Sequence, residues 1–439
     1  MTVELAHPST EPLAQRVPTE AAHPRWWFVN TTPGRILTIG LILAALGVLS
    51  AFAISTTINE RQNQLTAVLN HTEPLAFAAG QLYTTLSVAD AAAATAFIAG
   101  SEPQQVRQRY EQAITGAAVA VTRASSDLTD PPLVELLGRI NAQLAVYTGL
   151  IETARTNNRM GNPVGSSYLS EASALMQDTI LPDAQRLYEA TSARVDAETT
   201  TSAKIPAPVI IVVAATLGFG IFAHRWLARR TKRRVNIGLV AGGLAIAVMI
   251  VWVGTALTIS TAGSRSAKNT AAESLRTVTN LAITAQQARA DETLSLIRRG
   301  DEDVRKRSYY QRVDQMRQQL ADYLARKSTV DKSGLAQADQ LLEKWRQADE
   351  RINDYIAVGN YQAATQVALG TGEEDSTVAF DKLNAALSKG IEESRKQLRS
   401  DILSARRVLS GTTVGGAMLS VSAAVAVALG LWPRMSEYR

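Results

Sequence analysis

Cysteine is absent from the 439-residue chain, and aromatic residues make up only 5% of it. Without thiols, disulfide frameworks, cysteine-based metal sites and thiol catalysis are excluded. The histidines are His7, His23, His71 and His224, and none has a partner at metal-ligand spacing. Glycine-rich phosphate loops and serine-nucleophile elbows are missing as well. We therefore expect no catalytic residue, no metal, no cofactor and no enzymatic activity.

Charge is scarce in four stretches of an otherwise polar chain. These stretches are residues 36–57, 205–223, 236–258 and 409–431. Each is close to the ~20 residues that a helix needs to cross the hydrocarbon core of a bilayer. The regions between them are rich in Ala, Gln, Arg and Glu, and they lack the alternation of β-branched residues that marks strands. The sequence thus predicts an all-α membrane protein with four transmembrane helices.

A dense basic loop, residues 224–235, separates the second and third apolar stretches. It has no acidic residue, and its basic residues are Arg225, Arg229, Arg230, Lys232, Arg233 and Arg234. Short loops of this kind stay in the cytoplasm. Counting crossings then places residues 1–35 and 432–439 inside the cell, and residues 58–204 and 259–408 outside it. The net charges agree, at +7 for the inner segments together and −5 and +3 for the two outer regions.

Two alternatives to this topology concern the first span and the basic loop. The first span could be a cleaved signal peptide with Ala51–Ala53 as its cleavage site, although a 35-residue leader argues against this. The basic loop could bind nucleic acid, but a turn between two spans leaves no room for such a domain. Contact with anionic lipids fits the topology. We expect a multi-pass protein of the cell membrane, surrounded by the lipid bilayer, with no nucleic acid partner.

The two outer regions follow one plan. Clusters of Gly and Pro divide each into four helical segments, which in the first region are residues 59–99, 103–127, 133–158 and 167–204. At an offset of 200, Gly100, Glu102, Arg107 and Tyr110 match Gly300, Glu302, Arg307 and Tyr310. The lengths predict two extracytoplasmic four-helix bundles whose outer helices continue into the spans. The repeated plan indicates an internal duplication.

A heptad seam of mostly small and aliphatic residues runs along the first of these helices. Its positions are Ile58, Arg61, Leu65, Val68, Thr72, Leu75, Ala79, Leu82, Leu86, Ala89, Ala93 and Ala96. In the second region the seam is less regular, because Arg289 and Glu292 interrupt it. Pro74 and Pro182 lie inside long helices, where each should produce a kink.

The turns farthest from the membrane are the surfaces that a soluble partner could reach. Their candidate partner-binding residues are Gly100, Glu102, Asn162, Gly300, Asp301, Glu302, Glu373, Glu374 and Asp375. Charge at such tips would steer a partner more than hold it, although acidic residues also favour the start of a helix. Within the spans, Gly238 with Gly242 and Gly411 with Gly415 have the spacing that lets helices pack closely, against another span or a second copy of the chain.

Paired spans around a four-helix bundle resemble the sensor modules of chemoreceptors and sensor kinases, and GNYQAATQ (residues 359–366) looks like the start of a helix in such bundles. The whole layout resembles an actinobacterial family of four-span sensors. Members of that family link a glutamine-binding lipoprotein to a soluble Ser/Thr protein kinase, kinase G. The resemblance rests on architecture. It implies that the availability of glutamate, aspartate or glutamine outside the cell is relayed to the kinase inside.

The short inner segments leave no room for an output domain, so a separate protein must supply any signalling activity. We expect a non-enzymatic transmembrane receptor, with a solute-binding lipoprotein and a cytoplasmic kinase as partners. The alternative is a structural or transport-accessory membrane protein of the cell envelope. A receptor that binds a small molecule directly is a third, narrower hypothesis.

Overall fold

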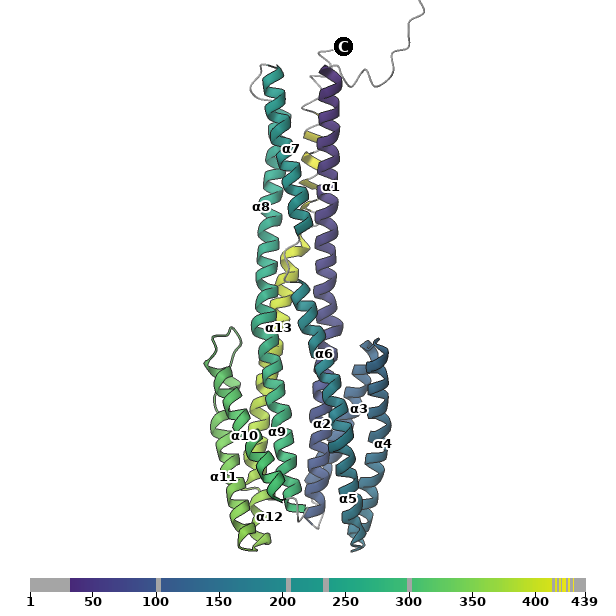
Figure 1. The fold of residues 1–439 in the computed structure, drawn as a ribbon, viewed down its shortest axis with the longest axis vertical. Helices are drawn as coiled ribbons and strands as arrows, with labels where there is room; N and C mark the ends of the chain where they lie inside the picture. The colour runs from purple at the N-terminus through teal and green to yellow at the C-terminus, as the bar shows by residue number, and fades with distance from the viewer. Residues whose placement is uncertain are drawn as a thin grey trace, which may run out of the picture. The chain divides into compact units, whose positions relative to one another are not determined.

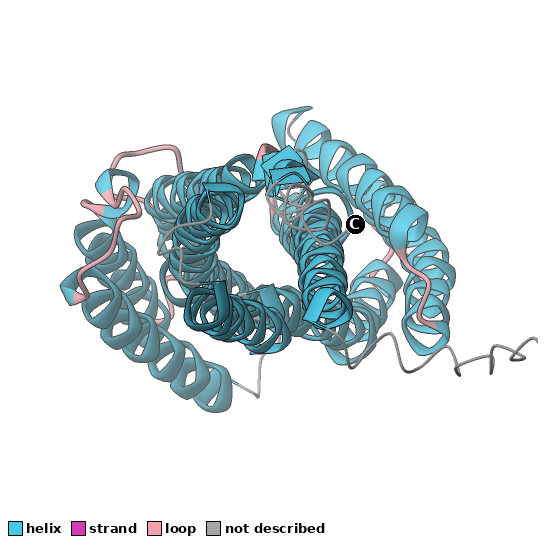
Figure 2. Cartoon of the chain, turned by 90° about the horizontal axis from the view of Figure 1, so that it is seen from above, coloured by secondary structure: helices cyan, strands magenta, loops and turns pink. Residues whose placement is uncertain are grey.

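The computed structural model describes residues 32–99, 104–202, 207–231, 237–297 and 302–412, and parts of 415–429. Its regular elements are all helices, which confirms the all-α prediction for these residues (Figure 2). The chain folds into two compact units. The first comprises residues 1–52, 210–249 and 418–439, and the second comprises residues 53–209 and 250–417.

The first unit contains apolar helices with the length of membrane spans. It contains the first part of α1 (Thr32–Ala67), most of α7 (Ala207–Thr231) and the beginning of α8 (Ile237–Ser266). The helical stretches Thr38–Ile98, Val209–Trp226 and Ala241–Leu296 each include a segment long and apolar enough to cross a membrane. They correspond to the first three predicted spans. Several residues of the fourth predicted span, 409–431, lie outside the described residues.

Large apolar side chains on these helices point outward. Leu41, Phe52, Ile211 and Ile221 are all more than half exposed. An exposed apolar surface of this kind is typical of contact with lipid, because water would disfavour it. A buried hydrogen bond of 2.7 Å between the hydroxyls of Ser50 and Thr216 ties α1 to α7. The helices of this unit therefore have the surface of a membrane protein.

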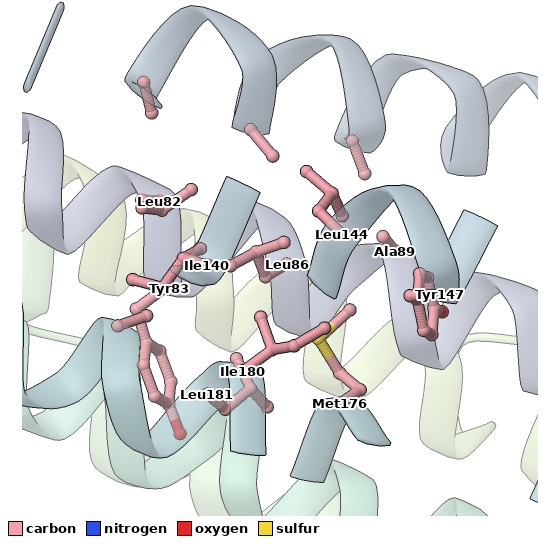
Figure 3. Close-up of a cluster of buried hydrophobic side chains, with 14 of the residues drawn as sticks. Leu82, Tyr83, Leu86, Ala89, Ile140, Leu144, Tyr147, Met176, Ile180 and Leu181 are labelled. Atoms are coloured by element: carbon pink, nitrogen blue, oxygen red, sulfur yellow. The ribbon is translucent and has the colours of Figure 1, made fainter. Parts of the chain in front are cut away.

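The second unit contains a first bundle, defined here as α2 (Glu73–Ile98), α3 (Gln104–Asp127), α4 (Pro131–Arg159), α5 (Val164–Leu175) and α6 (Leu181–Ser202) (Figure 1). The two prolines after Asp130 begin α4, where their missing N–H groups leave no helix bond unmade. All twelve residues of the predicted heptad seam are buried, so the seam is confirmed. Figure 3 shows Leu82, Leu86, Ile140 and Met176 meeting in this core.

A second bundle follows later in the chain. Its helices are α9 (Glu273–Ile297), α10 (Glu302–Ala325), α11 (Ala338–Ala357), α12 (Tyr361–Leu369) and α13 (Ser376–Ser410), with a short 3-10 turn, η5 (Ser333–Leu335), before α11. Trp345 is fully buried in its core. The centroid of its ring lies 5.3 Å from the ring centroid of Tyr309 and 5.0 Å from that of Phe380. The GNYQAATQ segment does begin a helix: Asn360 caps α12 by accepting a hydrogen bond from the N–H of Ala363.

Within the described ranges, three π-helical segments interrupt the long helices. They are η2 (Val68–Thr72), η3 (Met176–Ile180) and η4 (Ala267–Ala272). Pro74 and Pro182 each lie two residues after a π-helical segment, where the widened turn accommodates a proline that clashes with the preceding turn. The η4 segment is followed at the same place by Ser274. A π-helical turn therefore forms in this chain without a proline after it. The two prolines alone do not explain why the long helices are interrupted.

The two bundles pack against each other within the second unit, which the sequence did not predict. Helix α2 lies along α9, and Ile283 of α9 belongs to the core of the first bundle. A Cβ atom at Gly80 would lie 3.4 Å from both Thr279 and Tyr188, which is ordinary van der Waals contact, so α2, α6 and α9 are closely packed at this point. The outer regions that we expected as separate bundles thus form one compact unit.

Candidate functional site

Only some of the predicted partner-binding residues lie in the described part of the chain. Gly100, Glu102, Gly300 and Asp301 lie outside the described residues, and Glu302 is the first residue of α10. Asn162 lies in the α4–α5 turn, directly after Gly161, whose φ of 71° belongs to the left-handed region. The Asn162 side chain donates a 3.1 Å hydrogen bond to Asn157, so it stabilises the turn.

The acidic residues before α13 lie on an exposed surface. Arg351 donates a 2.9 Å hydrogen bond to Glu374, and Lys382 lies 3.4 Å from Glu373. Both carboxylates remain more than four-fifths exposed, so these pairs are weak. Asp375 precedes the first residue of α13 and accepts a 2.7 Å hydrogen bond from the N–H of Gly372. Asp375 is thus bound within its own loop, whereas the two glutamates present charge to solvent.

The predicted basic loop is shorter than expected, because α7 continues to Thr231. Arg225 and Arg229 are exposed on its last turns, and Arg230 belongs to the same helix. Lys232, Arg233 and Arg234 lie outside the described residues.

The glycines with helix-packing spacing differ from one another. Gly238 and Gly242 belong to α8, and Gly242 is buried. Gly411 has open space where a Cβ atom would be, whereas a Cβ atom at Gly415 would overlap the ring of Trp252 in α8. Close packing through a small residue is therefore observed at Gly415.

Deep in the first bundle lies a buried carboxylate, Asp90, with 4% of its surface exposed. It accepts hydrogen bonds from Tyr147 (3.3 Å), Ser173 (3.2 Å) and Gln177 (2.8 Å). These donors come from α4, α5 and η3, so one side chain of α2 holds together helices from across the bundle. Burial raises the pKa of Asp90 to about 6, because removal of water outweighs the three hydrogen bonds that favour the charged form.

A matching carboxylate, Glu292 of α9, lies in the second bundle and is 2% exposed. Trp345 of α11 donates a 3.2 Å hydrogen bond to it, and Ser376 of α13 donates another. Glu292 also pairs with the buried guanidinium of Arg289 one turn earlier. Nearby, burial and the charge of Glu292 raise the pKa of Asp349.

The Asp90 and Glu292 clusters have similar hydrogen-bond donors but differ in net charge. In each, a carboxylate on the helix that begins the bundle accepts from an aromatic side chain and from a serine on two other helices: Tyr147 and Ser173 bind Asp90, and Trp345 and Ser376 bind Glu292. The second cluster adds a guanidinium that balances the charge, whereas the donors bound to Asp90 are neutral.

A third polar cluster, which we call the Glu73 clamp, joins the bundles. Glu73 of α2 is 1% exposed and binds Arg395 and Arg399 of α13, the latter at 2.6 Å. Arg399 also donates a 3.1 Å hydrogen bond to the carbonyl oxygen of Leu69 in η2. The guanidinium of Arg395 lies 3.9 Å above the ring of Phe77. The clamp therefore connects the π-helical segment of the first bundle to the last helix of the second.

The sequence pattern reveals only part of these clusters. Arg289 and Glu292 interrupt a predicted apolar seam, and the structure shows that both are buried and paired. Asp90 was not predicted as a site residue, although it is a single acid within the apolar run VADAAAATAF. In the described part of the chain, no group of three or more His, Asp or Glu side chains is placed to hold a metal ion.

Comparison with known families gives one match. Residues 64–200 match a family model described as an actinobacterial sensor domain. This range includes η2, Glu73, Asp90 and nearly all of the first bundle. Neither the curated proteins nor the solved structures gave a match. The first bundle is therefore similar to actinobacterial sensor domains, which supports a membrane-associated sensor protein of actinobacteria.

Proposed function

We propose that this protein is a non-enzymatic transmembrane receptor that relays conditions outside the cell to a separate signalling protein inside it. One observation carries the proposal: the region similar to a sensor domain begins on a helix that is continuous with an apolar segment of membrane-spanning length. In that continuous stretch, α1, η2 and α2 join without a break from Thr32 to Ile98. A displacement of the bundle would therefore reach the membrane through covalent helical structure.

The proposed topology has four spans, with both chain termini and the basic loop in the cytoplasm and both bundles outside. The fourth span is supported by Met418, Val421, Val425 and Leu429, which recur at helical spacing and are all at least half exposed. The exposed basic residues at the end of α7, Arg225 and Arg229, are consistent with a cytoplasmic turn there. A reporter fused after residue 130 should accordingly be active only if it functions outside the cell.

For the signal itself we propose the amino-acid relay that the family resemblance implies. A solute-binding lipoprotein loaded with glutamate, aspartate or glutamine docks on the bundles and favours one of two bundle arrangements. A soluble Ser/Thr protein kinase reads the change at the short inner segments. Such a relay requires only that the partner bind the two arrangements with different affinity. The exposed Glu373 and Glu374 are the described tip residues best suited to steer a partner.

The test is co-purification of the full-length chain in mild detergent, followed by identification of the retained proteins. We expect both a solute-binding lipoprotein and a cytoplasmic kinase, with loss of the lipoprotein after charge reversal at Glu373 and Glu374. Charge reversal at Glu135, which is 77% exposed on α4, is the matched control. Deletion of the gene should alter phosphorylation of kinase substrates and leave amino-acid uptake intact. Loss of uptake with unchanged phosphorylation would instead support a transport-accessory protein.

A further inference from the structure

A cavity of about 260 Å³ lies where the two bundles meet. Its walls come from α2 and α3 of the first bundle, and from α9, α13 and the loop after α12 of the second. This volume far exceeds the ~10–15 Å³ that a single bound water needs. A molecule bound there would contact both bundles at once.

The charged groups around this cavity are two arginines and one aspartate. Arg109 of α3 donates two hydrogen bonds, of 2.9 and 2.6 Å, to Asp381 of α13. Their side chains are 39% and 42% exposed, so water competes for this ion pair. Arg109 can therefore exchange its hydrogen bonds to Asp381 for bonds to another acceptor. Arg289, the third charge, is buried and directs N–H groups to Glu292, Ser376 and Thr377. Asp381 balances the charge of Arg109 and Glu292 balances that of Arg289, so a carboxylate in the cavity would bind by taking the place of an acid already paired with arginine.

The remaining wall supplies neutral polar groups and apolar surface. Gln105, Thr95 and Thr371 can donate or accept hydrogen bonds, while Val88, Val106 and Phe380 cover much of the rest. Mostly apolar walls with a few convergent polar groups are typical of small-molecule sites. Guanidinium groups bind carboxylates through paired, charge-assisted hydrogen bonds. The lining thus suits a small organic molecule with a carboxylate and a short carbon chain.

We propose that this cavity is a binding site for a small carboxylate, held by Arg109 and Arg289 between the two bundles. Binding would draw Arg109 from Asp381 and add an acceptor beside the Arg289–Glu292 pair. Both events lie at the contact between bundles, so the ligand would favour one packing arrangement over another. Its signalling role rests on the proposed receptor function, but binding itself does not depend on any partner protein.

The site can be tested by calorimetric titration of the purified full-length chain in detergent micelles. The probes are glutarate and L-glutamate, which differ by one ammonium group, and 1,5-diaminopentane, a cation with the same chain length. We expect binding of one or both carboxylates and none of the diamine. Binding of L-glutamate alone would identify an amino acid as the ligand class, and binding of glutarate alone would identify a simple organic acid. Absence of binding by both carboxylates at millimolar concentration overturns the proposal.

Two variants separate this site from indirect effects. Arg109→Gln should weaken carboxylate binding by about tenfold or more, because a charge-assisted hydrogen-bond pair is lost. Arg107→Gln is the matched control, since Arg107 lies on the same helix and pairs with Glu111. Ala91→Leu should fill the cavity and abolish binding while the Arg109–Asp381 pair stays in place. If Arg109→Gln and Ala91→Leu both bind the carboxylate as tightly as the natural chain does, the site is rejected. This conclusion does not depend on the outcome of partner co-purification.

Discussion

Replacing Glu73 by glutamine tests whether the Glu73 clamp holds the bundles together. The carboxylate is 1% exposed, and removal of one partner from a buried ion pair costs about 3–5 kcal/mol. Arg395 and Arg399 are 28% and 37% exposed, so water can stabilise the freed guanidinium groups in part. Glutamine also retains hydrogen-bonding capacity. We therefore expect Glu73→Gln to lower the free energy of unfolding by about 2–3 kcal/mol.

The chain supplies its own control for this experiment. Glu273 occupies the same place at the start of α9, but its ion pair with Arg326 is exposed on both sides. Glu273→Gln should cost less than about 1 kcal/mol. Thermal unfolding of the full-length chain in detergent, followed by circular dichroism, compares the two variants. The Glu73→Gln and Arg399→Gln changes should also be non-additive when combined. Equal losses in Glu73→Gln and Glu273→Gln would refute the structural role assigned to the clamp.

Three further predictions concern the buried clusters and the packing of α13. Burial raises the folded-state pKa of Asp90 from 3.8 to about 6, so the stability supplied by its neutral form is complete below pH ~4 and is lost as the pH rises through ~6. Asp90→Asn should remove about 3 kcal/mol of this pH dependence, measured as the thermal midpoint between pH 4 and 7, and an unchanged profile would contradict the assignment. Trp345→Phe keeps a ring in the core but deletes the N–H donor to Glu292, and the midpoint should fall by the equivalent of about 1–3 kcal/mol. Gly390→Ala places a Cβ atom 2.7 Å from a buried leucine methyl group and should destabilise by about 1–3 kcal/mol, whereas Gly138→Ala, with open space around it, should stabilise by roughly 0.5–1 kcal/mol. Denaturation midpoints that rank the two glycine variants in the opposite order would contradict the packing around α13.

Helix positions followed from the sequence because they depend on local signals. The predicted segment 103–127 became α3 at Gln104–Asp127, since Pro103 precedes it in the sequence and the prolines after Asp130 begin the next helix. The heptad seam was readable for a similar reason: burial on one helix face repeats with a fixed period. These features require no knowledge of which helix lies beside which.

The packing between bundles could not be read in this way. Nothing in the local sequence indicates that Glu73 meets two arginines more than 300 residues later, because that contact depends on how two separately coded bundles pack. The same holds for Arg109 and Asp381. Burial of Arg289 was visible only as a defect in a pattern, and its partners Ser376 and Thr377 lie on another helix. Long-range polar contacts of this kind set the candidate site and escape periodicity.

The π-helical segments also determine how the chain tolerates changes in length. A π-helical turn is a one-residue insertion into an α-helix. Deleting one residue within Val68–Thr72 or Ala267–Ala272 can therefore be absorbed by a return to ordinary α-geometry, with later side chains kept on their faces. The same deletion in the middle of α2 would rotate every following side chain by about 100° and turn the buried stripe toward solvent. Each bundle thus has, next to its first helix, a π-helical turn with one extra residue, and a one-residue deletion there would leave the rest of the bundle in register.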